Sequence, residues 1–176
     1  TSSETVRNFN GTGRDTTINL SRYIIEDRRY DKKRASASML FEHKLTERIT
    51  FNAGASYVWQ RTHNFKVVED LLGGDLFLDV NQFAERDFVN DPDAVQNDLD
   101  NPNRLLKEGD RYGYDYNMTV SKPTVWAQGI INLSNWEFFA AANVSYTTFY
   151  RTGNYRSGLF PNDSKGDSEK QKFFNY

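Results

Sequence analysis

The strongest constraint on the fold is a regular alternation of apolar and polar or small residues between Ile49 and Trp59. Successive side chains of a β-strand point to opposite faces of its sheet, so this alternation predicts a half-buried strand. The predicted apolar face consists of Ile49, Phe51, Ala53, Ala55, Tyr57 and Trp59. The opposite face is nearly all polar or small, with Thr, Asn, Gly and Ser in the intervening positions.

Three more stretches alternate in the same way and complete two hairpins. Residues 35–41 precede the first strand, and the short segment Thr46–Arg48 joins the two. Residues 125–133 and 136–150 form the second pair, with a turn at Ser134–Asn135. The apolar face of the last strand begins with Trp136, Phe138, Ala140, Ala142 and Val144. We therefore predict an all-β fold of antiparallel, up-and-down strands, in which these five residues share one outward face with the apolar set of residues 49–59.

The alternation changes phase inside the region 112–133. Apolar residues occupy even positions in residues 112–120 and odd positions in residues 125–133, with Pro123 between the two sets. A β-bulge shifts the phase without ending a strand, and bulges tolerate proline. The alternative is two separate strands with a kink between them. We expect a break in the pleat at or beside Pro123.

The connections between strands alternate between short and long. Two short turns, at Thr46–Arg48 and Ser134–Asn135, alternate with long connections at residues 61–111 and 152–176. In an up-and-down sheet this order places the short turns at one end and the long loops at the other. Outer-membrane barrels have that asymmetry, with short periplasmic turns and long external loops.

The composition argues against several other classes of protein. The chain has no cysteine, and His43 and His63 lack a matching ligand spacing, so no metal centre is predicted. With 22 basic and 24 acidic residues, it carries no electrostatic signature of nucleic-acid binding. No apolar run approaches the roughly 18 residues of a membrane helix, and the mean hydropathy is −0.76. No Ser/His/Asp set can be assembled, so the chain is not expected to be an enzyme or to need a cofactor.

Alternation by itself does not distinguish a lipid-facing strand from a strand of a soluble β-sandwich. Strands of eleven or more residues match the roughly 9–11 residues that cross a bilayer. Phe138 and Tyr146 are eight residues apart, roughly 20 Å along the membrane normal, close to the spacing of two aromatic girdles. Two interpretations stay open at this point, a membrane barrel and a soluble all-β ligand-binding module resembling those that bind carbohydrate.

The loop sequences favour the barrel. Residues 65–88, 97–118 and 151–174, together with YIIEDRRYD at 23–31, resemble barrel segments of TonB-dependent outer-membrane receptors from Bacteroidetes. The resemblance implies a barrel of about 22 strands in the outer membrane of a Gram-negative bacterium, plugged by an N-terminal domain. It further implies import of a bulky nutrient of unknown class, with membrane lipid around the barrel and energy supplied by the TonB system.

This sequence departs from that family pattern in one large respect. It contains no plug domain and no coupling box, and about four clear strands cannot close such a barrel. We therefore expect residues 1–176 to form part of one β-barrel domain of a longer protein. The energy-coupling partner would act through the missing N-terminal part.

The long loops supply the candidate ligand contacts. The connection at 61–111 far exceeds what joining two strands requires, and its apolar residues predict that it folds onto itself. We expect it to form an external vestibule in which Phe77, Phe83 and Tyr112 contact the ligand. The alternative is that these aromatic residues pack the loops against one another.

An acidic stretch at residues 87–103 suggests calcium as a second possibility. Its carboxylates are those of Asp91, Asp93, Asp98 and Asp100, but the ordered spacing of a calcium loop is missing. Asx turns around Pro92 and Pro102 are the favoured interpretation, and no metal site is predicted.

Overall fold

The computed structural model describes residues 2–6 and 16–176 and is all-β, with 65% strand and 4% helix. The predicted fold class is confirmed at this level. The chain divides into two compact units. The first, here called the loop unit, comprises Thr1–Asp31, His63–Asn117 and Thr152–Ser168, and the second, the turn unit, comprises Lys32–Thr62, Met118–Arg151 and Glu169–Tyr176.

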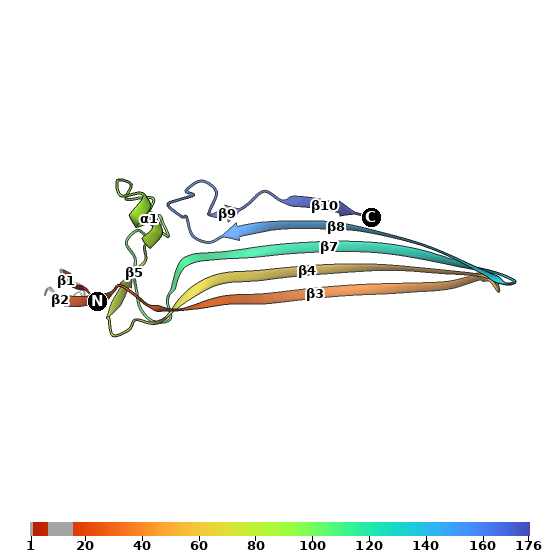
Figure 1. Ribbon diagram of the computed structural model, residues 1–176, viewed down its shortest axis with the longest axis horizontal. Helices are drawn as coiled ribbons and strands as arrows, with labels where there is room; N and C mark the ends of the chain where they lie inside the picture. The colour runs from red at the N-terminus through yellow and green to blue at the C-terminus, as the bar shows by residue number, and fades with distance from the viewer. Residues whose placement is uncertain (1, 7–15) are drawn as a thin grey trace. The chain divides into compact units, whose positions relative to one another are not determined.

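One six-stranded sheet contains the long strands, in the order β10-β8-β7-β4-β3, with β9 paired to β8 (Figure 1). The long strands of this sheet lie side by side in the order in which they occur along the chain, as expected of an up-and-down sheet. The bounds are β3 (Ile25–Thr46), β4 (Ile49–Asp70), β7 (Arg111–Leu133), β8 (Trp136–Gly153), β9 (Gly166–Asp167) and β10 (Gln171–Asn175).

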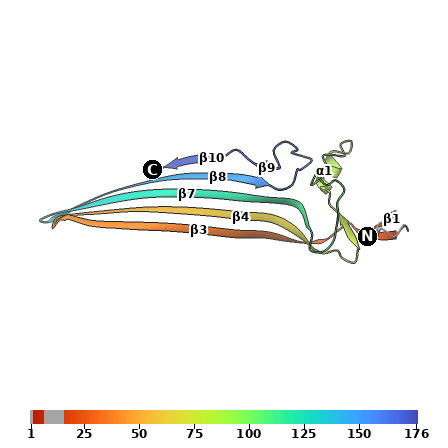
Figure 2. The same ribbon diagram turned by 180° about the vertical axis from the view of Figure 1, so that it is seen from behind.

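Both predicted short turns are present, and both belong to the turn unit (Figure 2). Two residues join β3 to β4, and the Thr46 hydroxyl accepts a hydrogen bond from the Arg48 amide at 3.2 Å. Two residues also join β7 to β8, and Ser134 there has a φ of 49°. That left-handed backbone is typical of tight hairpin turns.

Large apolar side chains of the turn unit lie open. Trp136 is 72% exposed and Phe138 54% exposed, and Phe51 and Tyr57 on β4 are exposed as well. Every buried apolar side chain of the described residues belongs to the loop unit instead. A sandwich would bury the apolar face between two sheets, and no such burial is present in the described part of the turn unit. The common outward face of β4 and β8 stays a prediction.

Close packing within the turn unit occurs between β4 and β7. A Cβ added to Gly54 would lie 2.4 Å from the indole nitrogen of Trp126. Glycine at position 54 therefore makes room for the indole ring on the neighbouring strand.

β7 runs without interruption from Arg111 to Leu133, so the interpretation as two separate strands is wrong. Before Pro123 the odd-numbered side chains of Asp115, Asn117 and Thr119 are buried, whereas Val125 after it is exposed. The bulge stays a prediction, supported by this change. A proline inside a strand that has neighbours on both sides cannot donate to the ladder, which is the physical reason to expect an irregularity there.

β4 is longer than its alternating part. It continues to Asp70, so the connection to β7 runs over residues 71–110 rather than starting at Arg61. Residues 64, 65, 67 and 68 are all buried, which means that both faces of the strand are covered here. A strand covered on both faces has no reason to alternate, and this explains why periodicity did not reveal the extension.

The long connection contains one short helix and contributes two strands to a second, smaller sheet. A small sheet has the order β1-β2-β5-β6, and β2 pairs in parallel with β5. Its strands are β1 (Ser2–Val6), β2 (Thr16–Ser21), β5 (Leu76–Leu78) and β6 (Leu105–Leu106). Helix α1 (Gln82–Asp87) is capped at its N-terminus by Asn81, whose side chain accepts hydrogen bonds from the amides of Phe83 and Ala84. Within the described part of the chain, no helix combines the length and the apolar character needed to cross a membrane.

The core of the loop unit is a cluster of buried side chains against which Ile24 packs. They are Val68, Leu71, Phe77, Leu106 and Tyr112. Residues from β4, β5, β6 and β7 thus meet in one core, as predicted for a connection that folds onto itself.

Two adjacent leucines provide a test of this core. Leu71 is 5% exposed and Leu72 is 53% exposed. We expect Leu71→Ala to lower the free energy of local unfolding by about 2–4 kcal/mol, because it leaves a cavity. Leu72→Ala, the matched control, is expected to change it by less than about 0.5 kcal/mol. Native-state hydrogen exchange of the Val68 and Gly109 amides measures the effect, and equal changes in both variants would contradict the described core.

Candidate functional site

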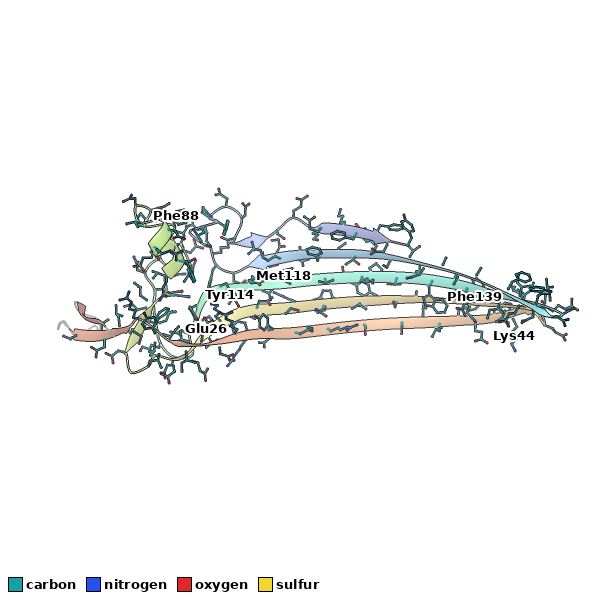
Figure 3. All side chains as sticks on the ribbon, viewed as in Figure 1. Glu26, Lys44, Phe88, Tyr114, Met118 and Phe139 are labelled. Atoms are coloured by element: carbon teal, nitrogen blue, oxygen red, sulfur yellow. The ribbon has the colours of Figure 1, made fainter. Side chains whose placement is uncertain are left out.

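The loop unit contains a cavity of about 570 Å³, within the usual size range of ligand pockets. Side chains from the start of β3, the start of β7, helix α1 and the segment 157–160 line it. Figure 3 labels two of them, Glu26 on β3 and Tyr114 on β7. The three residues predicted to contact the ligand, Phe77, Phe83 and Tyr112, all line this cavity, so the fold brings them together.

Glu26 is the polar centre of the cavity wall. Its Oε2 atom accepts hydrogen bonds from Lys66 Nζ at 2.9 Å and from the Tyr112 hydroxyl, and its Oε1 atom binds Arg28 Nε. Burial by itself would raise the pKa of Glu26, but hydrogen bonds from Tyr112, Lys66 and Arg28 lower it to about 2. The carboxylate is therefore ionised at neutral pH. Burial and the bond to Glu26 raise the pKa of Tyr112, which stays a neutral donor.

Two tyrosine rings hold the Lys66 ammonium group beside Glu26. Its Nζ atom lies 5.3 Å from the ring centroid of Tyr112 and 5.4 Å from that of Tyr114. An ammonium group above aromatic faces gains cation–π attraction, which strengthens when water is excluded. Lys66, Glu26 and the two tyrosines thus form a polar cluster that connects β3, β4 and β7.

The three predicted aromatic residues do not have equal access to a ligand. Phe77 and Tyr112 are 5% and 8% exposed, and their rings meet edge to face with centroids 5.7 Å apart. Both therefore pack the core as well as lining the cavity, which agrees with the packing alternative. Phe83 is 74% exposed and is open to a ligand. Ligand binding by the three residues stays a prediction.

Charged and polar lining residues were missed at the sequence level. Arg22, Tyr23, Glu26, Arg28 and Lys66 all line the cavity. Four of these five belong to the charged stretch around residues 22–28, which the alternation of the strands does not explain. The departure of this stretch from strand alternation was the one sequence feature that could have indicated these lining residues. It does not predict that Lys66, forty residues later, forms an ion pair with Glu26.

A buried carboxylate fixes the connection next to the cavity. Asp79 is almost completely buried and binds Arg104 Nη2 at 2.6 Å and Asn97 Nδ2 at 2.8 Å. It also accepts a hydrogen bond from the Gly113 amide at 3.1 Å. A buried charge is tolerated only when its lone pairs are satisfied, and these three donors do so.

The acidic stretch is occupied by turns and by contacts to the second long connection. The amides of Asp93 and Ala94 donate to Asp91, and the Asp100 amide donates to Asp98. The Asx turn predicted around Pro92 is thereby confirmed. The second turn lies at Asp98–Asp100 rather than around Pro102, where the Asn103 amide donates to Gln96 Oε1 instead. Across residues 2–6 and 16–176, no group of three or more acidic, histidine or cysteine side chains is arranged to hold a metal ion.

Asp100 ties the two long connections together. It binds Arg156 Nε at 2.7 Å and Lys165 Nζ at 2.6 Å, and hydrogen bonds from Lys165 and Arg156 lower the pKa of its carboxyl group. Close by, Gly158 approaches the backbone so tightly that an added Cβ would lie 1.8 Å from the Asp93 carbonyl oxygen. The contact therefore requires glycine, and the two connections form one folded body.

His63 takes part in a fourth polar cluster. Its Nε2 atom lies 2.6 Å from Oδ1 of Asp115, which also accepts from Asn154 Nδ2 at 2.5 Å. Arg111 Nη1 lies 3.0 Å from Oδ2 of the same aspartate. Burial raises the pKa of Asp115, but hydrogen bonds from His63 and Asn154 outweigh it and the pKa is lowered. The cluster joins β4, β7 and the residue that follows β8.

No family model matches this chain, and comparison with curated proteins and with solved structures found no match.

The Glu26 cluster predicts a pH-dependent stability. Because the pKa of Glu26 is lowered from 4.5 to about 2 in the folded chain, its contribution is complete above about pH 5 and disappears as the pH falls to about 2. Tyr112→Phe removes one donor to the carboxylate. We expect it to lower the free energy of unfolding by about 1–2 kcal/mol at pH 7 and by less at pH 3.

Urea unfolding at pH 7, 5 and 3 measures this difference. Tyr116→Phe is the matched control, because it removes a hydroxyl from the same strand outside the Glu26 hydrogen bonds. A Tyr112→Phe effect of equal size at pH 7 and pH 3 would contradict the assigned role of Glu26.

Proposed function

We propose that this chain is part of a TonB-dependent outer-membrane receptor that imports a bulky nutrient, and that it has no enzymatic activity. The observation that carries the proposal is the unequal distribution of buried apolar side chains. The long strands expose large apolar residues in the turn unit, while the buried apolar side chains of the described residues all belong to the loop unit. Lipid is the medium that would cover such a face in a barrel.

The lengths of the strands support the same proposal. β3 and β4 have 22 residues each, β7 has 23 and β8 has 18. A tilted strand needs only roughly 9–11 residues to cross a bilayer, so each has residues to spare. The spanning segments would lie in the turn unit, and the remaining residues would carry the sheet beyond the membrane toward the long connections.

The folded loop unit fits the role of an external vestibule. Its connection of residues 71–110 packs into a core with residues of β4 and β7, and Asp100 binds two cations of the segment 156–165. A receptor must capture its cargo from outside, and all the residues that line the cavity belong to the loop unit, as do both long connections. The plug domain and the contact with the TonB system would come from other parts of the receptor.

Two neighbouring alanines of β8 test the lipid-facing assignment. Ala140 belongs to the predicted outward face and Ala141 to the opposite face, and both are exposed here. In the full-length receptor, we expect Ala140→Arg to destabilise the inserted barrel by about 2–4 kcal/mol, because an arginine near the bilayer midplane is costly. Ala141→Arg, facing the polar interior, is expected to have a much smaller effect.

Unfolding of the receptor in lipid vesicles measures this difference. Equal effects of both substitutions would contradict the outward face. A full-length protein that stays monodisperse without detergent would overturn the barrel and favour the soluble carbohydrate-binding alternative.

Deleting residues 72–105 from the full-length receptor tests the vestibule. We expect the barrel to assemble in the outer membrane and nutrient uptake to be lost, because the deletion removes most of the folded connection. Val89→Ala changes an exposed residue of the same connection and serves as the control with unchanged uptake. Uptake is measured with labelled nutrient, and normal uptake by a correctly inserted deletion variant would rule out this role.

A further inference from the structure

The cavity of the loop unit has an excess of positive charge. Three cations line it, Arg22, Arg28 and Lys66, against the single carboxylate of Glu26, which gives a net lining charge of 3 − 1 = +2. Glu26 already binds both Arg28 and Lys66. Arg22 makes no ion pair within the described part of the chain. The protein's own side chains thus leave part of this charge uncompensated.

The two arginines are placed to receive an anion. Both are exposed, and Glu26 contacts Arg28 through the Nε atom only. Among the described residues, no acceptor occupies the terminal nitrogens of Arg28. A guanidinium group binds carboxylates through two parallel N–H donors, so these nitrogens suit an incoming carboxylate.

Exposed aromatic rings line the same cavity from three segments. Tyr23 follows β2, Phe83 belongs to α1 and Phe160 belongs to the second long connection. All three are more exposed than buried, although large apolar side chains are usually covered. Aromatic faces beside cations offer a stacking surface for a planar ring that bears a negative charge.

We propose that this cavity binds an anionic ligand with a planar ring, of the chemical class of aromatic carboxylates. Arg22 and Arg28 contact the carboxylate, and Tyr23, Phe83 and Phe160 contact the ring. This identification of the ligand class rests on the proposed function, because it assigns the cavity to the captured nutrient. A neutral ligand of the same shape gains nothing from the excess charge and binds more weakly.

The test uses the purified full-length receptor in detergent micelles and isothermal titration calorimetry. The probe is 2-naphthoate, compared with neutral 2-naphthamide and with cyclohexanecarboxylate, which has the charge but no flat ring. We expect 2-naphthoate to bind at least about tenfold more tightly than either, with an affinity that falls as salt is raised.

Paired substitutions separate local from general charge effects. Arg22→Gln with Arg28→Gln removes two cations from the cavity lining, and we expect it to weaken 2-naphthoate binding by about tenfold or more. Arg29→Gln with Lys107→Gln removes two cations of the same unit that do not line the cavity, and affinity should stay within about twofold. Binding of 2-naphthamide should be unchanged in both double variants.

Three results would each overturn the proposed ligand class. They are no binding of 2-naphthoate, equally tight binding of 2-naphthamide, and an equal loss of 2-naphthoate affinity in the two double variants. None of them affects the proposed receptor, which is tested by membrane insertion and uptake. Conversely, a full-length protein that binds 2-naphthoate as expected but does not insert in the membrane would retain the site and reject the receptor.

Discussion

The structure depends on very long strands whose side chains are exposed in one part of the strand and buried in another. In the turn unit β4 alternates, and its apolar residues are open to whatever surrounds the sheet. In the loop unit the same strand is buried on both faces, from Asn64 to Val68. Backbone pairing within the sheet satisfies the peptide groups in both environments, so only the side chains have to change. This constraint explains why the long strands contribute to the apolar core in one part of their length and expose apolar residues in another.

Buried and half-buried carboxylates organise the loop unit around that core. Asp79, Asp115 and Glu26 each bind two or more donors from distant parts of the chain, and Asp100 binds two cations of the second connection. Such groups are tolerated in the interior only with their partners in place, so the clusters also specify one arrangement of the connections. The cavity is a consequence of that arrangement. Its wall combines buried groups that stabilise the fold, such as Tyr112, with exposed groups, such as Phe83.

Sequence periodicity predicted the regular part of the structure and failed in identifiable places. The alternating strands and both short turns are present because a half-buried strand leaves a period of two in the sequence. The extension of β4 to Asp70 was missed because its two faces are covered alike. The parallel pairing of β2 with β5 and the short strand β6 were not foreseen, since strands of two or three residues are too short to show a period.

The sequence by itself determined the all-β class, the order of short and long connections, and Phe77, Phe83 and Tyr112 as residues of one region. These properties follow from local alternation, turn length and the apolar content of the loops. Only the tertiary structure decided that Phe77 and Tyr112 are core residues while Phe83 is open, and that Lys66 and Glu26 meet beside them. Burial and ion pairing depend on contacts between residues far apart in the chain, and the linear pattern of one strand contains no information on its neighbours.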